Sequence, residues 1–263
     1  MTKVLANKSQ AIAAHRASMM TLRRNIVVLT ATIDPSDGNI TIALSDKHER
    51  LRQYLENIRN LILKTDFTHI IFCENSNYTH DFSELISLAN NNCKALEILS
   101  FTGSNEIIKD KGKSYGEAEI LNFAVDNSMH LEDDNVTFYK LTGRIFVDNI
   151  NKILRENCCD NIFIRWDVRK KEVDTRFFKV QTRFYKKNLY RLLDQMNESC
   201  GLSIEEVYFN HLKGNATIHS FKTYPAIRGI CASLGKPYDL GLFKSIYRKL
   251  QLKTGLLDLR RCS

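Results

Sequence analysis

Short apolar runs recur along the first half of the chain, separated by polar turns or by longer amphipathic stretches. The runs have the length of buried strands and lie at 26–33, 69–73, 96–101 and 136–141. The stretches between them repeat apolar residues at spacings of three and four, typical of helices, at 46–64, 82–89 and 115–129. Strands that alternate with helices predict an α/β fold with a mostly parallel sheet flanked by helices.

The second half alternates less regularly, which indicates a mixed α/β arrangement. Its predicted strands lie at 161–166, 176–180 and 216–221, its helices at 184–198 and 203–213, and its loops at 224–229 and 234–238. With three prolines in the chain and no low-complexity segment, we expect one large domain with two halves. The halves are 25–150 and 151–240, between an N-terminal basic segment (1–24) and a basic amphipathic tail (241–263) with a predicted C-terminal helix.

The charge distribution limits the partners that are expected, and the cysteine content indicates a cellular location. The net charge is +8, and the tail 241–263 holds six Lys or Arg residues against one acid. The rest of the chain is nearly balanced, so a general nucleic-acid-binding surface is not expected. Adjacent Cys158 and Cys159, with no Cys-x-x-Cys pair, favour a reduced, cytoplasmic location. No apolar run approaches the roughly 18–20 residues of a transmembrane helix.

Two turns combine glycine with cationic residues. The first, Lys111-Gly-Lys-Ser-Tyr-Gly-Glu117, precedes a predicted helix. Ser114 and Glu117 have the spacing of a capping box, which leaves Lys111 and Lys113 to contact phosphates. The spacing is not that of a Walker A sequence, so we do not infer an ATPase.

The second turn, Thr142-Gly-Arg144, follows the predicted strand 136–141. Ligands of parallel sheets bind beyond the carboxyl ends of the strands, so this turn is expected at a binding site. Arg144 offers a planar fork to a phosphate or to sugar hydroxyls. Lys140 points along an alternating strand, and Arg144 is therefore preferred as the functional cation. The alternative is a strand turn with a solvated Arg144.

Candidate acid–base residues lie in the second half. Ser203-Ile-Glu-Glu206 has capping-box spacing, in which Glu206 reaches back to the cap. Glu205 is then the freer carboxylate and the first candidate for a general base, and Glu206 is the second. His219 is a candidate donor to a leaving group, with a structural role as the alternative. No His, Cys, Asp or Glu cluster has metal-ligand spacing.

The tail is amphipathic as well as basic. Its apolar stripe comprises Leu242, Phe243, Ile246 and Leu250, interleaved with Lys244, Arg248 and Lys249. This pattern is typical of an interfacial helix on anionic lipid. A helix docked on its own domain is the alternative.

The order of these motifs resembles a group of bacterial glycosyltransferases that act in capsule and lipopolysaccharide O-antigen assembly and have a GT-A-like (Rossmann-like) fold. The resemblance covers residues 25–240. Its matching motifs begin at Glu74 (Glu-Asn-Ser), Lys111 (Lys-Gly-Lys-x-Tyr-Gly-Glu), Tyr139 (Tyr-Lys-Leu-Thr-Gly-Arg), Asp174 (Asp-Thr-Arg-Phe-Phe), Ser203 (Ser-Ile-Glu-Glu) and Tyr224 (Tyr-Pro-x-Ile-x-Gly). It implies a hexosyltransferase that moves a sugar from a nucleotide-diphosphate donor, expected to be a UDP-sugar.

The resemblance also implies an acceptor, which would be a saccharide or a lipid-linked oligosaccharide. The location and the other partners are predicted from the rest of the sequence. The charge distribution predicts no nucleic acid as partner, the cysteine pattern predicts the cytoplasm, and the tail pattern predicts a peripheral place at the inner face of the plasma membrane, with 241–263 against an anionic membrane surface.

The resemblance assigns roles to single residues. The half 25–150 would bind the nucleotide sugar, and the half 151–240 would bind the acceptor and carry out an inverting transfer. The donor-binding residues implied by the resemblance are Thr30, Thr32, Glu74, Lys113, Gly116 and Glu117. The positions of the turn 142–144 and of His219 add four further predicted donor-binding residues: Thr142, Gly143, Arg144 and His219. Asp174 and Arg176 would bind the acceptor, and the catalytic base would be Glu205 or Glu206.

One position departs from the GT-A pattern. An Asp-x-Asp sequence after the fourth strand would hold a divalent metal, and here Lys-Leu-Thr-Gly-Arg144 stands in its place. A cationic side chain would then stabilise the leaving diphosphate. We therefore predict no required cofactor, with Mn²⁺ or Mg²⁺ as an open alternative.

Two other classes of protein remain as alternatives. A nucleotidyl- or phosphotransferase on a similar α/β sheet would need carboxylates that gather Mg²⁺ around the phosphates. A nucleic-acid-binding module would need a continuous basic face with exposed aromatic residues.

Overall fold

The computed structural model describes residues 24–35, 44–156, 159–229 and 241–262. Within these residues, five strands form the main sheet in the order β3-β2-β1-β4-β6. These strands are β1 (Ile26–Ala31), β2 (His69–Glu74), β3 (Ala95–Ser100), β4 (Thr137–Thr142) and β6 (Phe177–Gln181). The first four in this order are parallel, and β6 runs antiparallel to β4. The predicted α/β fold with a mostly parallel sheet is confirmed.

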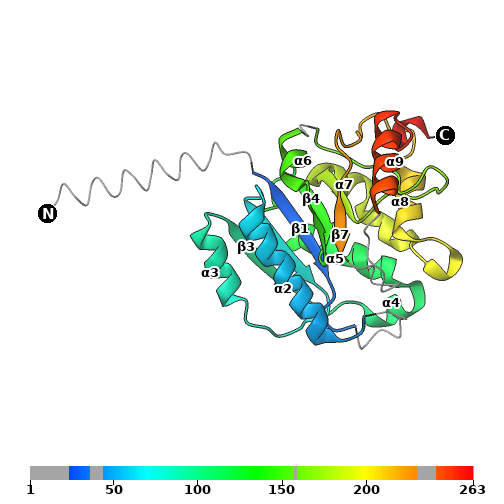
Figure 1. Ribbon diagram of the computed structural model, residues 1–263. Helices are drawn as coiled ribbons and strands as arrows, with labels where there is room; N and C mark the ends of the chain where they lie inside the picture. Colours follow the sequence, from blue (N-terminus) through cyan, green and yellow to red (C-terminus); the bar gives the residue numbers. More distant parts are fainter. Residues whose placement is uncertain (1–23, 36–43, 157–158, 230–240, 263) are drawn as a thin grey trace, which may run out of the picture.

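Helices cover both faces of this sheet (Figure 1). One hydrophobic core includes side chains of α2 (Lys47–Lys64), α3 (Ser83–Asn91) and α6 (Ile150–Glu156). The other includes α5 (Lys113–Asn127), α7 (Thr182–Asn188) and α8 (Ile204–Leu212). Alternate residues of β1 enter alternate cores: Val27 and Leu29 enter the first, and Ile26 and Val28 the second. Burial on both faces explains why the strand is continuously apolar.

Smaller elements complete the fold. A separate two-stranded sheet pairs β5 (Ile145–Val147) antiparallel with β7 (Ile227–Gly229). The remaining helices are α4 (Asn105–Lys111), η1 (Tyr190–Gln195), η2 (Glu198–Cys200), α9 (Gly241–Lys253) and η3 (Leu259–Arg261).

The second half differs most from the sequence prediction. The predicted helix 184–198 is divided into α7 and the 3₁₀ helices η1 and η2, and these tighter turns bring Leu192 and Met196 into the core. The predicted strands 161–166 and 216–221 are reduced to isolated bridges. The predicted loop 224–229 contains β7. The predicted loop 234–238, and the N-terminal segment except Arg24, lie outside the described residues.

The predicted tail helix is confirmed as α9. It is held to the rest of the protein by buried Leu252 and Gln251, and by an ion pair between Arg248 and Asp167 at 2.8 Å. In the part of the chain that the structure describes, no helix combines the length and the hydropathy needed to cross a bilayer.

The turn after β4 is held in place by β1 and α2. The amide of Gly143 donates to the Thr30 carbonyl at 2.9 Å. The Asn57 side chain of α2 donates to the carbonyls of Gly143 and Ile145, each at 2.8 Å. A Cβ atom on Gly143 would lie 2.8 Å from the Thr30 carbonyl oxygen and 2.8 Å from the Tyr54 ring. Glycine is therefore required here by the close approach of two other elements.

Replacing this glycine is expected to destabilise the fold. Gly143→Ala forces a methyl group against backbone and ring atoms, and we expect a loss of about 1–3 kcal/mol in the free energy of unfolding. Urea denaturation followed by circular dichroism measures this loss.

Gly116→Ala is the matched control. Its methyl group would meet the end of the flexible Ile108 side chain at 3.1 Å, and alanine gains about 1 kcal/mol of helix propensity over glycine. We expect little change for this variant. Equal losses at both positions would contradict the special role of the Gly143 turn.

Candidate functional site

Polar side chains gather at the carboxyl ends of the parallel strands, on the side of the sheet that α5 covers. Thr30 of β1 lies beside Thr142 of β4 in the strand register. The Thr32 hydroxyl donates to the Asn75 side chain at 2.7 Å. Ligands of α/β sheets bind at this edge, so these residues lie where a ligand is expected.

A buried lysine lies at the centre of this edge. The Lys140 side chain is 0% exposed and forms an ion pair with Glu117 of α5, whose side chain is 26% exposed. Its ammonium group also donates to the Thr142 hydroxyl at 2.9 Å and to the Thr175 carbonyl at 2.7 Å. A buried ammonium group is costly unless it is paired in this way. Lys140 is thus held inside the protein by these partners, and the preference for Arg144 over Lys140 as the cation for a leaving diphosphate stays a prediction.

Glu205 joins the same cluster through Thr175. The Thr175 hydroxyl donates to Glu205 Oε1 at 2.9 Å. Burial raises the pKa of Glu205 and the charge of Glu117 raises it further, while Thr175 and Lys140 act in the opposite direction. A carboxyl group with a raised pKa in a polar cluster is a candidate for proton transfer. We call the set Lys140, Glu117, Thr142, Thr175 and Glu205 the lysine cluster.

The neighbouring Glu206 has a different place. Ser203 caps α8, and Glu206 Oε2 accepts from the Ser203 amide at 3.0 Å, so the predicted capping box is confirmed. This bond directs Glu206 back to the helix start. Of the two adjacent carboxylates, Glu205 is the one that reaches the lysine cluster.

The capping box predicted at Ser114 is wrong. Gly112, with a φ of +97°, stands at the N-cap of α5, and Glu117 turns to Lys140 instead. The carboxylate of Glu198 takes over the capping role, because it accepts from the Ser114 amide at 3.1 Å and from its hydroxyl at 2.6 Å. Lys113 is exposed at the first position of the helix.

Glu74 shapes the turn after β2. Its buried carboxylate accepts from the Ser76 amide at 2.8 Å and hydroxyl at 2.6 Å, from the Tyr78 amide at 2.9 Å, and from the Ser100 hydroxyl. These hydrogen bonds all come from groups of the protein itself. Binding of a nucleotide-sugar donor by Glu74 stays a prediction. Gly116, by contrast, lies where α4 packs on α5, close to Ile108 and Asn75.

Two arginines lie near the same edge but on the α2 side. Arg144 donates to the Gln53 side chain at 3.3 Å, and its guanidinium lies 5.9 Å from the centre of the Tyr54 ring. Arg50 is buried and donates to the Thr32 carbonyl at 2.8 Å. Burial lowers the pKa of Arg50, and the positive charge of Arg144 acts in the same direction. The edge thus carries positive charge that suits an anionic ligand.

Asp174 and Arg176 form a closed ion pair. Arg176 Nε donates to Asp174 Oδ1 at 2.9 Å, and the guanidinium lies 3.8 Å from the centre of the Trp166 ring. Burial and the charge of Asp174 raise the pKa of nearby Tyr224 to about 12. The Arg176 carbonyl accepts from the Thr142 amide at 3.0 Å, so the pair lies beside the end of β4. A role in acceptor binding stays a prediction.

His219 lies apart from the lysine cluster. Its amide donates to the Asn161 carbonyl at 2.8 Å, and it forms a bridge with Ile162, which in turn pairs with Lys179 of β6. At the usual strand spacing this places the His219 backbone about 14 Å from β4. The structure does not bring His219 to the residues around Lys140.

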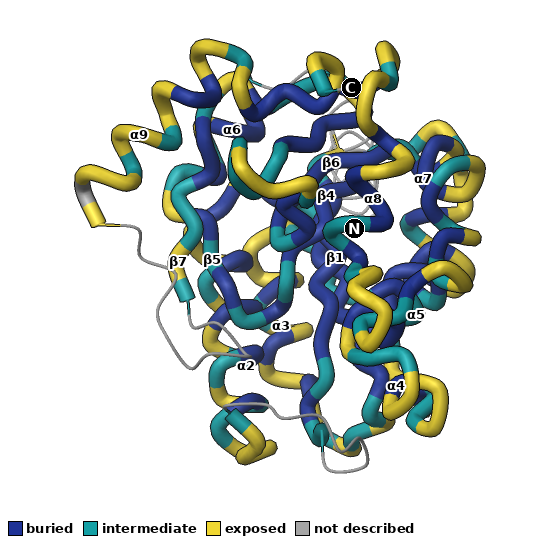
Figure 2. Tube along the Cα trace, turned by 90° about the vertical axis from the view of Figure 1, so that its right-hand side faces the viewer, coloured by how far each residue is buried: buried dark blue, intermediate teal, exposed yellow. Residues whose placement is uncertain are grey.

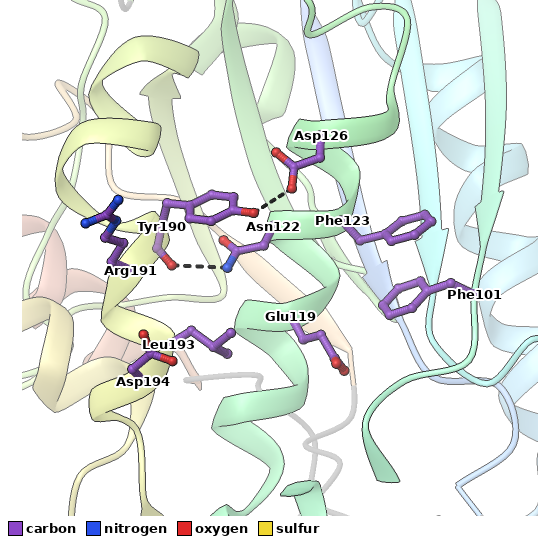
Figure 3. Close-up of a pocket in the computed structure, with 9 residues that line it drawn as sticks. All are labelled: Phe101, Glu119, Asn122, Phe123, Asp126, Tyr190, Arg191, Leu193 and Asp194. Carbon is purple, nitrogen blue, oxygen red and sulfur yellow. Dashed lines mark hydrogen bonds between the residues drawn. The ribbon is translucent and has the colours of Figure 1, made fainter.

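A groove of about 400 Å³ lies between α5 and η1 (Figure 3). Phe101 and Phe123 stack in it with ring centres 4.1 Å apart, and Tyr190 donates to Asp126 at 2.6 Å. Glu119, which lines the groove, lies two residues after Glu117 and is therefore about 200° away from it around the axis of α5. The groove and the lysine cluster are thus on different sides of this helix. None of the site residues predicted from the sequence lines this groove.

The residues at the end of β4 do not fit a divalent cation. Thr142, Gly143 and Arg144 offer no carboxylate there, and the nearby carboxylate of Glu117 is paired with Lys140. Among the described residues, no group of three or more His, Cys, Asp or Glu side chains is arranged to hold a metal ion.

Comparisons with known proteins give remote structural likeness. No protein-family model matches the chain, and no curated protein matches it. The chain is similar to the apo-form glycosyltransferase GlyE of Streptococcus pneumoniae, with 10% identity and a TM-score of 0.49, over 76% of this chain and 45% of that one. It is also similar to S. aureus TarS, with 11% identity and a TM-score of 0.41, over 90% of this chain and 40% of that one. The chain thus spans less than half of the length of these proteins.

The raised pKa of Glu205 predicts a pH-dependent stability. Because the pKa is higher in the folded than in the unfolded protein, the folded state binds more protons, and stability falls as pH rises from the ordinary glutamate value through the raised one. Glu205→Gln removes this loss. The free energy of unfolding of this variant, relative to that of the wild type, is therefore expected to increase from acidic to neutral pH.

Urea denaturation at a series of pH values measures this difference. Glu206→Gln is the matched control, since glutamine can also complete the capping box. If the free energies of unfolding of Glu205→Gln and wild type differ by the same amount at every pH, the raised pKa of Glu205 is contradicted.

Proposed function

We propose that this protein is a glycosyltransferase that moves a hexose from a nucleotide-diphosphate sugar, a UDP-sugar, to a saccharide acceptor. One observation carries the proposal: near the carboxyl edge of the sheet Lys140 is paired with Glu117, and Thr175 links Lys140 to a second carboxyl group, that of Glu205. A transfer to a hydroxyl needs a positioned base and a charge environment prepared for a leaving diphosphate. The order of motifs over 25–240, which resembles capsule and O-antigen glycosyltransferases, supports the same class.

The proposed reaction is a single displacement. An acceptor hydroxyl oxygen attacks the anomeric carbon, its proton passes to the Glu205 carboxylate, and the bond from this carbon to the diphosphate oxygen breaks. The electron pair of that bond leaves with the nucleoside diphosphate. A single displacement inverts the anomeric configuration. Glu117 and Lys140 adjust the proton affinity of Glu205 through their charges.

Cationic side chains are proposed to accompany the donor. Arg144 lies at the turn after β4, and buried Arg50 holds the chain after β1 through the Thr32 carbonyl. Positive charge at this edge favours a diphosphate and supports its departure. The proposed setting is the cytoplasm, with a surface-polysaccharide intermediate as acceptor.

Release of nucleoside diphosphate from a panel of nucleotide sugars, with saccharide acceptors, tests the proposal. Glu205→Gln is expected to reduce turnover by about 10²-fold or more, because loss of a general base has that magnitude. Assays with a chelator and with added Mn²⁺ or Mg²⁺ measure any dependence on metal.

Glu84→Gln is the matched control, because Glu84 is an exposed glutamate on α3, where it pairs with Arg59. It is expected to keep wild-type turnover. Normal turnover of Glu205→Gln would overturn the base assignment. If the wild-type protein transfers no sugar from any donor of the panel, the proposed class is wrong.

A further inference from the structure

Helix α9 carries a continuous apolar stripe that faces solvent. Phe243, Ile246, Tyr247 and Leu250 are all exposed, with Phe243 at 86% and Leu250 at 54%. Because successive helical residues are turned by about 100°, these four side chains lie within an arc of about 100°. Figure 2 shows α9 at the margin of the molecule with most of its length exposed.

The same helix is fixed to the protein by its other side. Leu252 and Gln251 are buried, and Arg248 pairs with Asp167 at 2.8 Å. The helix therefore does not need the stripe in order to dock on its own domain. Contiguous apolar groups that remain outside mark a surface for a partner.

Lysines border the stripe on both sides. On a helical projection, Lys249 and Lys253 lie on one flank and Lys244 on the other, and α9 contains no Asp or Glu. Long lysine side chains can extend from such positions towards phosphate groups while the apolar face is buried. A second copy of this chain docked through the same stripe would instead place like charges together.

We propose that α9 binds the surface of a bilayer that contains anionic phospholipids, with its apolar stripe in the interfacial region and its three lysines against the phosphates. The helix lies parallel to the membrane plane, because the stripe runs along its axis. Burial of the apolar side chains gives the attachment, and the lysines make it depend on anionic lipid and on salt. This inference does not depend on the proposed glycosyl transfer.

Sedimentation of the full chain with vesicles tests the proposal. We expect binding to vesicles of phosphatidylcholine mixed with phosphatidylglycerol, weakened by added salt, and little binding to phosphatidylcholine alone. Phe243→Glu combined with Leu250→Glu is expected to lower the partition coefficient at least tenfold. Lys249→Gln combined with Lys253→Gln is expected to lower it and to reduce its dependence on salt.

Leu63→Glu is the matched control, since Leu63 is 52% exposed near the end of α2. It introduces one leucine-to-glutamate change, as at Leu250, at similar exposure outside the stripe and is expected to bind like wild type. Thermal melting checks that all variants remain folded. The proposal is overturned if the wild-type chain does not bind the anionic vesicles, or if the stripe variant binds them like the control.

Light scattering tests whether a second copy of the chain, rather than a membrane, covers the apolar stripe. A wild-type dimer that the stripe variant converts to a monomer, with no change in vesicle binding, would assign the stripe to a second copy and overturn the proposal. Sugar transfer to a water-soluble acceptor, measured on the same variants, reports on the glycosyltransferase proposal separately.

Discussion

The arrangement of the candidate site depends on the burial of one ammonium group. Lys140 is fully buried in a strand that packs on both faces, and its charge is balanced by Glu117 on α5. A buried charge is tolerated when an opposite charge and further hydrogen bonds surround it. This requirement brings α5, β4 and the segment with Thr175 together at one point.

The ion pair between Lys140 and Glu117 also affects a third group, the carboxyl group of Glu205. Thr175 contacts Lys140 through its carbonyl and Glu205 through its hydroxyl. The charges of Glu117 and Lys140 therefore both act on the pKa of Glu205, the first raising it and the second lowering it. The α2 side of the same edge is different, because Arg50 and Arg144 lie there beside neutral Tyr54 and Gln53.

The sequence predicted the sheet and most helices of the first half, because strands buried on both faces and amphipathic helices leave clear periodic patterns. It did not predict that Glu117 turns to Lys140, since the Ser114 spacing also fits a capping box and Glu198, 84 residues further along the chain, cannot be placed from sequence. Arg50 was missed as well. The sequence did contain a pattern that predicts it. Arg50, Tyr54 and Asn57 have the helical spacing of the buried face of α2, so polar side chains are expected to be buried there. In the second half, isolated bridges and 3₁₀ turns depend on tertiary contacts that have no periodic pattern.

The Asn57 side chain has a consequence for how the protein folds. One amide group on α2 bonds the carbonyls of Gly143 and Ile145, which lie 86 and 88 residues away along the chain. Contacts of such separation close a long loop, and their entropic cost is met once the intervening strands and helices have formed. The turn after β4 therefore depends on contacts with β1 and α2 that are distant in the sequence, and the edge of the sheet that is proposed to bind the donor has its final form only when these elements are assembled.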